Sequence, residues 1–375
     1  MLVGYFRWLK SISKKMALLN NVNKVIHSNR LLFNATTGCP YAPEGIQKPF
    51  VVADPIKLTK EVLCVHLNIR EELNTKSKRF QECIHYYFDN EGKLFRPVLI
   101  VLMAKALNVH QQNTSDLLEC QLKMAMIAEM IHTASLLHDD VIDDAVLRRN
   151  KPSINQIFTS KQSILAGDFT LARASILLSR LQNTKVVEFF SEIIHDLVKG
   201  ELMQLVSKDD IDQRFNHYLT KTFRKTASLM ANSCKSVALL ANCSSFVQEM
   251  AFEYGKNLGM AFQLVDDALD IISSAETLGK PAGVDMSLGL ATAPVLFAAQ
   301  KFPDLHAIIG RRFKNKVEDV QKALEYVNQS DGVSETFMLA SKYAMEACKS
   351  ISSLKDSEEK AALITLANFV VERKR

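Results

Sequence analysis

The chain has 375 residues, 47% of them hydrophobic and 23% charged, which is the composition of an ordinary globular protein. That length suffices for one large domain or two ordinary ones, and no uninterrupted apolar run approaches the roughly 20 residues of a membrane-spanning helix. The seven cysteines contain no Cys-x-x-Cys pair and no zinc-like spacing, so we expect reduced thiols, several of them in the core.

The net charge of +5 arises in residues 1–43, which carry six basic residues and no acidic one. Without those six, 40 basic residues stand against 41 acidic ones, a net charge of −1. This removes the usual electrostatic argument for binding nucleic acid. Leu, Phe and Trp between the cations are typical of a mitochondrial transit peptide, so we expect the mature protein in the mitochondrial matrix. A disordered basic tail is the alternative interpretation.

Residues 44–56 form the predicted linker, in a segment from 40 to 56 that holds four prolines. From there onward the hydrophobic period is helical, clearest over 116–138, 217–241 and 248–272. Turn signals fall between these segments, and no strand alternation flanked by hairpin turns is apparent. The sequence therefore predicts an all-α domain over residues 57–375, built from long helices joined by short loops.

Two acidic clusters, in "LLHDDVIDD" and "QLVDDALD", share one spacing. Each places carboxylates at positions i, i+1 and i+4 of an expected apolar helix, and the second copy follows the first by 127 residues. Such groups repel one another unless a cation lies between them, and Mg²⁺ held by carboxylate and phosphate oxygens suits that role. A solvated helix face is the alternative for either cluster alone. The clusters are Asp139, Asp140 and Asp143, and Asp266, Asp267 and Asp270.

Basic and imidazole side chains accompany the first cluster. His132 lies two helical turns before Asp139 on the same stripe, which favours contact with a ligand, although a buried core histidine is the alternative. Arginine suits bidentate phosphate contact and lysine serves as a point charge, so nearby cations would fit a second, metal-free polyanion. Solvated surface cations are the alternative. The cations are Lys93 and Arg96 in "GKLFRP", and Arg148 and Arg149.

These motifs resemble the trans-isoprenyl diphosphate synthases, and the long-chain branch of that family fits best. The resemblance covers residues 55–375 and includes "GKLFRP", "HTASLLHDDVID", "LAGDF", "GELMQL", "FRKTA", "FQLVDDALD" and "LGKP" in family order. It implies an isoprenoid-synthase-type helical bundle around a deep central cavity, usually in a dimer.

The resemblance also implies a role for each matching residue. The six aspartates would hold two or three Mg²⁺ ions against an allylic diphosphate, which Arg148, Lys225 and Lys280 would also bind. Isopentenyl diphosphate would occupy a pocket of Lys93, Arg96, His132 and Arg149. Thr226 and Gln263 would lie near the reacting carbons.

By the same resemblance the chain is a Mg²⁺-dependent prenyltransferase that condenses isopentenyl diphosphate with farnesyl or geranylgeranyl diphosphate. Its product would be the long prenyl tail of ubiquinone. It would act as a homodimer, or as a heteromer with a second prenyl synthase subunit, and associate peripherally with the inner mitochondrial membrane. A terpene cyclase on the same fold and a weakly active or non-catalytic subunit are the alternatives.

Product length is expected to depend on the residues beneath the first aspartates. Ser135 and Ala134 stand four and five residues before Asp139, with Ile131 and Met130 one turn further. Neither Phe nor Tyr is present there to plug a tunnel, which predicts a long product. Close packing of helices through small residues is the alternative.

Three positions depart from the family pattern after the first cluster. The family has Asp, Thr and Gly where this chain has Val146, Leu147 and Asn150. The first two remove a polar pair next to Arg148, which predicts altered kinetics or loss of activity without loss of the carboxylates. Asn can still adopt the left-handed conformation that Gly would take.

Overall fold

The computed structural model describes residues 60–88, 94–148, 151–205, 211–276 and 283–373. The predicted leader and linker lie outside these residues. Over the described ranges, no helix has the length and apolar character that crossing a membrane requires.

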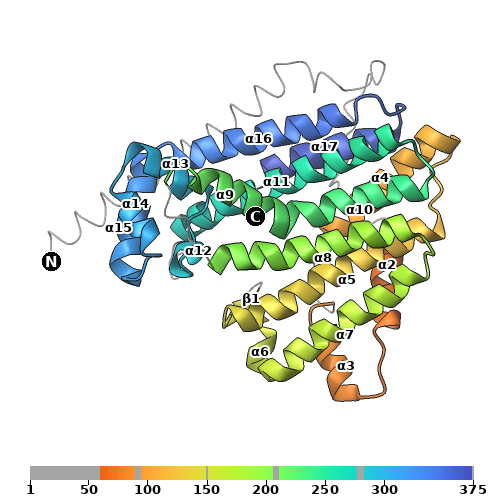
Figure 1. Ribbon diagram of the computed structural model, residues 1–375, viewed down its shortest axis with the longest axis horizontal. Coiled ribbons are helices and arrows are strands. Elements are labelled where there is room, and N and C mark those ends of the chain that lie inside the picture. The colour runs from red at the N-terminus through yellow and green to blue at the C-terminus, as the bar shows by residue number, and fades with distance from the viewer. Residues whose placement is uncertain (1–59, 89–93, 149–150, 206–210, 277–282, 374–375) are drawn as a thin grey trace.

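The expected all-α architecture is confirmed in these ranges (Figure 1). The first half of the chain forms α2 (Lys60–Glu72), α3 (Lys78–His85), α4 (Phe95–Gln112), α5 (Glu119–Ile142), α6 (Ile154–Ile157), α7 (Ser160–Ser179) and α8 (Thr184–Leu205). The second half forms α9 (Arg214–Thr222), the π-helix η1 (Phe223–Ala227), α10 (Ser228–Leu240), α11 (Ser245–Glu276), α12 (Val284–Ser287), α13 (Ala293–Lys301), α14 (Leu305–Gly310), α15 (Lys316–Gln329), α16 (Gly332–Ser350) and α17 (Glu358–Glu372).

One short strand pair departs from the sequence prediction. β1 (Leu147–Arg148) and β2 (Lys151–Pro152) pair antiparallel directly after the first acidic cluster. Each strand has only two residues, too few for a period-two pattern to reveal it in the sequence. The hairpin carries Arg148 back toward the end of α5, where it reaches Asp140.

Two clusters of buried apolar side chains make up the core. The larger joins α2, α4, α5, α7, α10, α17 and the first half of α11, and the smaller joins the second half of α11 to α12–α15. Figure 1 shows α12–α15 gathered at one end of the molecule, with α5, α7 and α8 side by side beneath α10 and α11. The second acidic cluster therefore lies on α11 beyond the point where the helix passes from one core to the other.

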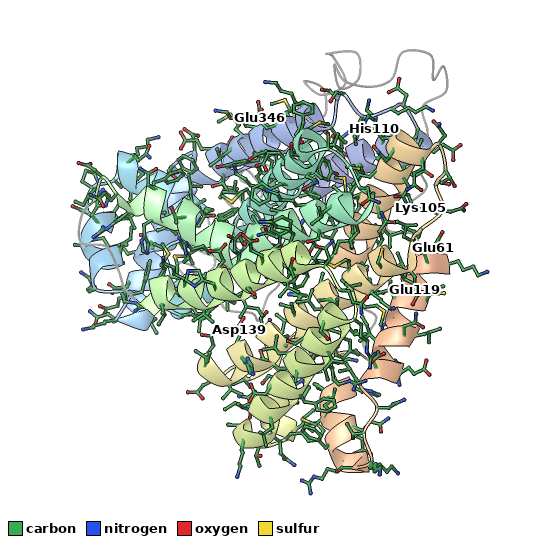
Figure 2. All side chains as sticks on the ribbon, turned by 45° about the vertical axis from the view of Figure 1, so that its right-hand side comes forward. Glu61, Lys105, His110, Glu119, Asp139 and Glu346 are labelled. Atoms are coloured by element: carbon green, nitrogen blue, oxygen red, sulfur yellow. The ribbon has the colours of Figure 1, made fainter. Side chains whose placement is uncertain are left out.

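Local sequence fixes several helix ends. α7 begins with a capping box, in which the Thr159 hydroxyl accepts from the backbone N–H of Gln162 and the Gln162 side chain accepts from the N–H of Thr159. Ser357 caps α17 by accepting from the N–H of Lys360. Salt bridges then join distant helices, as between Lys105 of α4 and Glu61 of α2 at 2.7 Å, which lie side by side in Figure 2.

α10 and α11 approach each other backbone to backbone. A Cβ atom at Gly255 would lie 2.6 Å from the carbonyl oxygen of Met230, and one at Gly259 would lie 2.6 Å from Cα of Ala227. Real Cβ atoms do not tolerate such separations, so the two glycines set the distance between these helices. Their spacing of four residues places both on one face of α11.

The π-helical turn η1 falls at "FRKTA", one of the motifs that carry the family resemblance. A π-bulge inserts one extra residue into a helical turn and is frequent at functional sites. Here it joins α9 to α10, and Lys225 and Thr226 lie within it. Gly259 packs against its last residue, Ala227, so the bulge and the second acidic helix are held together.

A buried lysine closes the turn between α16 and α17. The Lys360 side chain is 4% exposed, and its ammonium donates to the carbonyl oxygens of Ser352 and Leu354, both at 2.8 Å. It also donates to the carboxylate of Asp356 at 2.9 Å. Three charge-assisted hydrogen bonds thus satisfy backbone acceptors that would otherwise be buried without donors.

We expect Lys360→Met to lower the free energy of unfolding by about 3 kcal/mol, because two buried carbonyl groups lose their donor. Urea denaturation of the purified chain measures this loss. Lys349→Met removes an exposed lysine from the end of the adjacent helix α16 and should change stability by less than about 0.5 kcal/mol. Equal urea midpoints for the Lys360→Met and Lys349→Met variants would contradict a stabilising role for the buried Lys360 ammonium.

Candidate active site

A cavity of about 920 Å³ lies where α5, α8, α9, η1, α11 and α12 meet. Both acidic clusters contribute to its wall, through Asp143 and Asp267. Predicted ligands of phosphate and of the reacting carbons line it as well: Arg148, Lys225, Thr226 and Gln263. Asp143 and Asp267, which are 124 positions apart in the sequence, are thereby brought to one cavity, as expected for two acidic helices that face each other.

The first acidic cluster occupies the C-terminal end of α5, and Figure 2 labels Asp139 there, at the opposite end of the helix from Glu119. α5 ends at Ile142 and Asp143 is its C-cap residue, exposed toward the cavity. Asp140 is fully buried and accepts hydrogen bonds from the Tyr87 hydroxyl and from Nε of Arg148. The three carboxylates of one helical turn therefore have different surroundings.

In the second cluster each carboxylate likewise has its own partner. Asp266 accepts from the guanidinium of Arg373 at 2.6 Å, and that guanidinium stacks 3.9 Å from the ring centroid of Phe262. Asp267 is buried at the cavity wall. Asp270 accepts from the backbone N–H of Asp285 at 3.4 Å, which joins α11 to α12.

A continuous hydrogen-bond chain runs along the cavity wall. The Thr226 hydroxyl donates to Oε1 of Gln263 at 2.8 Å, and the Gln263 amide donates to Asp267 at 2.9 Å. The Tyr218 hydroxyl donates to the other oxygen of Asp267 at 2.6 Å. Because Thr226 gives its proton to Gln263, the lone pairs of its oxygen remain available to the cavity.

Burial raises the pKa of the carboxyl groups around this cavity. It raises the pKa of Asp139 to about 6, aided by the negative charge of Glu201, and that of Asp267 to about 6. The pKa of Asp285 rises to about 8, through burial first and then through the charges of Asp267 and Asp270. Because burial disfavours the charged forms of these groups, protons or added cations would stabilise them.

Lysines on the opposite wall supply positive charge. Lys225 lies 2.5 Å from a carboxylate oxygen of Glu201 and donates to Gln204 at 3.0 Å. One turn earlier, Lys221 also lines the cavity, and burial lowers its pKa. A desolvated ammonium is a strong site for an anion, because little water remains to compete for it.

Several residues that line the cavity were not predicted, among them Tyr218, Lys221, Gln204 and Asp285. Lys221 could have been found, because it stands four residues before Lys225 and shares its helical face. No local sequence pattern indicated Asp285, and Gln204 gave no signal beyond its place in "GELMQL".

The predicted isopentenyl diphosphate pocket is only partly within the described residues. Lys93 and Arg149 lie outside them, as does Lys280 of the predicted allylic diphosphate site and Asn150 of the hairpin. Arg96 and His132 are described and half-buried on α4 and α5, but they are not among the residues that line the 920 Å³ cavity. The role of this pocket stays a prediction.

The predicted chain-length residues are packed inside the protein. Met130, Ile131 and Ala134 of α5 are 0–2% exposed, and Ser135 is half-buried with its hydroxyl donating to the carbonyl of His132 at 2.9 Å. None of the four lines the cavity. Val146 and Leu147, which replace the polar pair of the family, do line it and are 65% and 63% exposed.

The donor set fits Mg²⁺. Carboxylate oxygens from two helices face one cavity with raised pKa values, and Mg²⁺ is usually held by one or two carboxylates together with phosphate oxygens and water. In the described part of the chain, no three His, Cys, Asp or Glu side chains gather closely enough to enclose an ion by themselves. A ligand phosphate would therefore have to complete the coordination.

Comparisons with known proteins agree with this geometry. The family model described as polyprenyl synthetase matches residues 77–327. The all trans-polyprenyl-diphosphate synthase PDSS1 of Homo sapiens is 50% identical over 321 residues, covering 85% of this chain and 77% of that protein. The decaprenyl-diphosphate synthase subunit 1 of Schizosaccharomyces pombe is 45% identical over 332 residues, covering 82% and 88%. A polyprenyl synthase from Caulobacter crescentus, solved with calcium and isoprenyl diphosphate, superposes with a TM-score of 0.75 at 33% identity, covering 84% of this chain and 95% of that one.

The raised pKa of Asp285 predicts a pH-dependent stability. From the usual carboxyl pKa near about 4 up to about 8, the folded chain holds a proton that the unfolded chain has lost, so its free energy of unfolding falls as pH rises. Asp285→Asn removes this titration. In a chelating buffer the variant should become more stable than the original chain, with the difference growing by up to about 1 kcal/mol per pH unit between pH 5 and 8.

Urea denaturation at four pH values measures this difference. Glu325→Gln, an exposed position on α15, is the control and should give a difference that is independent of pH over the same range. A constant difference for Asp285→Asn as well would contradict the predicted coupling.

Proposed function

The chain belongs to the polyprenyl synthetase family and is a prenyltransferase, and from this membership we propose that it condenses isopentenyl diphosphate with an allylic diphosphate such as farnesyl or geranylgeranyl diphosphate. Repeated condensation would build the long all-trans prenyl tail of ubiquinone. The observation that carries the proposal is the shared cavity, in which Asp143 and Asp267 from the two acidic helices lie together with Arg148 and Lys225.

We assign departure of the allylic diphosphate to this cavity. When the allylic C–O bond breaks, its electron pair moves to the diphosphate, so groups that stabilise negative charge there lower the barrier. Lys225 and Arg148 line the cavity as cations, and both are held by carboxylates, Glu201 and Asp140, from which they would turn to the substrate. Mg²⁺, held by the two aspartate clusters, would supply Lewis-acid stabilisation of the same leaving group.

Thr226 and Gln263 would stabilise the positive allylic carbon. The Thr226 oxygen has lone pairs available, and Gln263 keeps it oriented through the hydrogen bond at 2.8 Å. Such fixed dipoles stabilise a developing charge without reorganising during the reaction. The C=C bond of isopentenyl diphosphate would attack this carbon, forming the new C–C bond, and loss of a proton to the departed diphosphate would restore the double bond.

We further propose that the chain works as a dimer, either with itself or with a second prenyl synthase subunit. Apolar side chains recur every four or seven residues along one exposed face of α8: Val187, Ile194, Val198 and Leu202. Leu165 and Ile176 of α7 are exposed apolar side chains as well. Exposed apolar surface of this kind favours burial against a partner. The name of the S. pombe relative, a subunit 1, supports a heteromer.

The basic, acid-free leader supports import into mitochondria, with the mature chain in the matrix. The apolar product supports peripheral association with the inner mitochondrial membrane, where a long prenyl chain would be released. Assays of the purified chain, with and without a candidate second subunit, should therefore include membrane vesicles.

Asp139→Ala should reduce turnover of farnesyl diphosphate and labelled isopentenyl diphosphate in Mg²⁺ by at least about a hundredfold, because a metal-binding carboxylate is lost. The assay is incorporation of label into extractable lipid. Glu325→Ala, an exposed carboxylate on α15, is the control and should retain activity. Near-normal turnover by Asp139→Ala would end the assignment of this cluster to the reaction.

Ala134→Phe should shorten the product, because the ring would fill space beneath the first aspartates that a growing chain needs. Reverse-phase chromatography of the lipid gives the chain lengths directly. Ala128→Phe is the control, because it overpacks another fully buried position of α5, six residues before Ala134. If Ala134→Phe alone shortens the product, the effect comes from a plug and not from general destabilisation of the helix. An unchanged product distribution in Ala134→Phe would refute the plug.

A further inference from the structure

Asp140 connects the end of α5 to the hairpin that carries Arg148, and each of its carboxylate oxygens accepts a hydrogen bond from the protein. The hydroxyl of Tyr87, which lies two residues beyond the end of α3, donates to Oδ2, and Nε of Arg148 donates to Oδ1. The Asp140 side chain is fully buried, whereas that of Arg148 is 28% exposed and lines the large cavity. One buried carboxylate therefore joins a tyrosine outside the cavity to an arginine at its wall.

The Tyr87 hydroxyl also contacts the segment that follows the hairpin. Its oxygen accepts from the backbone N–H of Ile154, the first residue of α6, at 3.1 Å. Burial first, and then the hydrogen bond to Asp140, raise the pKa of this hydroxyl, so it keeps its proton and remains a donor. The neighbouring Tyr86 donates to the carbonyl of Pro152, at the end of β2, at 2.8 Å. The two tyrosines therefore hold the chain on both sides of the junction between β2 and α6.

The hairpin closes on itself through Ser153. The Ser153 hydroxyl donates to the carbonyl of Ala145, and its N–H donates to the carbonyl of Val146 at 3.0 Å. Val146 and Leu147, which replace the polar pair of the family, are apolar and 65% and 63% exposed, so neither side chain can fasten the hairpin by a hydrogen bond or by burial. The contacts of the two tyrosines and of Arg148 attach this unit to α3 and α5.

The pairing with Asp140 leaves the phosphate-binding end of the Arg148 guanidinium for a ligand. Asp140 engages Nε, and the two terminal nitrogens, Nη1 and Nη2, can present N–H groups to phosphate oxygens in the cavity that Arg148 lines. An arginine that is held in one orientation before binding loses less conformational entropy when a ligand arrives. Asp140 thus sets the position from which Arg148 reaches a diphosphate, and its own orientation depends on the Tyr87 hydroxyl.

We propose that Tyr87 is a positioning residue for the diphosphate site, because its hydroxyl orients Asp140 and Asp140 orients the Arg148 guanidinium. Tyr87 is not among the residues that line the cavity, so it acts through these two side chains. Without the hydroxyl, Oδ2 of Asp140 loses its donor and the carboxylate can rotate away from Nε of Arg148. The contact of Arg148 with an allylic diphosphate rests on the function proposed above, whereas its attachment through Asp140 to Tyr87 does not.

Calorimetric titration of farnesyl diphosphate, in Mg²⁺ and without isopentenyl diphosphate, measures the effect on binding without elongation. Tyr87→Phe removes only the hydroxyl and should weaken binding about fivefold to tenfold, because the arginine is no longer held in place. Tyr254→Phe is the matched control, since it removes another buried hydroxyl, which donates to the carbonyl of Leu363 at 2.7 Å in the larger core. It should change the affinity by less than about twofold.

A double-mutant cycle separates positioning from a merely structural role. Arg148→Gln should itself weaken binding of farnesyl diphosphate. Adding Tyr87→Phe to it should weaken binding by less than about twofold further, since the guanidinium through which Tyr87 acts is gone. If the hydroxyl only stabilised the fold, Tyr87→Phe would weaken binding by the same factor with and without Arg148. Equal factors, or wild-type affinity in Tyr87→Phe, would overturn the proposal.

Hydrogen exchange of the chain without ligand tests the attachment independently of the proposed function. Tyr87→Phe should speed amide exchange in segments 145–148 and 151–154, where the N–H of Ile154 loses its acceptor, and Tyr254→Phe should leave these segments unchanged. Unchanged exchange there in Tyr87→Phe would refute the attachment. If the unmodified chain failed to bind farnesyl diphosphate, the function proposed above would fall, and this comparison would still decide whether Tyr87 holds the hairpin.

Discussion

Buried negative charge is the constraint on which this structure depends. Carboxylates from α5, α11 and α12 approach one cavity, where burial and mutual repulsion raise the pKa of Asp139 to about 6 and that of Asp285 to about 8. Such groups are tolerated only where donors or cations reach them. The chain meets part of this need itself, with Arg148 at Asp140 and Arg373 at Asp266. Bound divalent cations would offset the buried negative charge that remains, and they would in turn hold a diphosphate ligand.

The scaffold pairs cations of the cavity with carboxylates, Lys225 with Glu201 and Arg148 with Asp140. Carboxylates reach the cavity from the end of α5, from α11 and from α12, and cations reach it from α9, η1 and the hairpin. The π-helical turn places Lys225 and Thr226 at the cavity, and Thr226 is then tied to α11 through Gln263.

The sequence predicted the helical architecture and both acidic clusters because each rests on a local period or spacing. The i, i+1, i+4 pattern within apolar helices predicted that Asp143 and Asp267 would reach one cavity. The spacing could not predict which side chains would pair with these carboxylates. Arg373 lies 107 positions from Asp266 in the sequence, and the two meet only because α17 packs on α11. The hairpin has strands of only two residues and the π-helical turn has only five, so neither produces a hydrophobic periodicity in the sequence, and the sequence predicted neither.

Finally, the glycine contacts of α11 determine which wall of the large cavity can move. Gly255 and Gly259 place α11 directly against the backbone of α10 and η1, with the Ala227 methyl group and the Met230 sulfur beside the contact. That seam can neither slide nor separate without losing its packing. Space for a lengthening hydrocarbon chain must therefore come from the wall of the cavity that the end of α5 and the hairpin form. Side chains there, including the exposed Val146 and Leu147, can change rotamer.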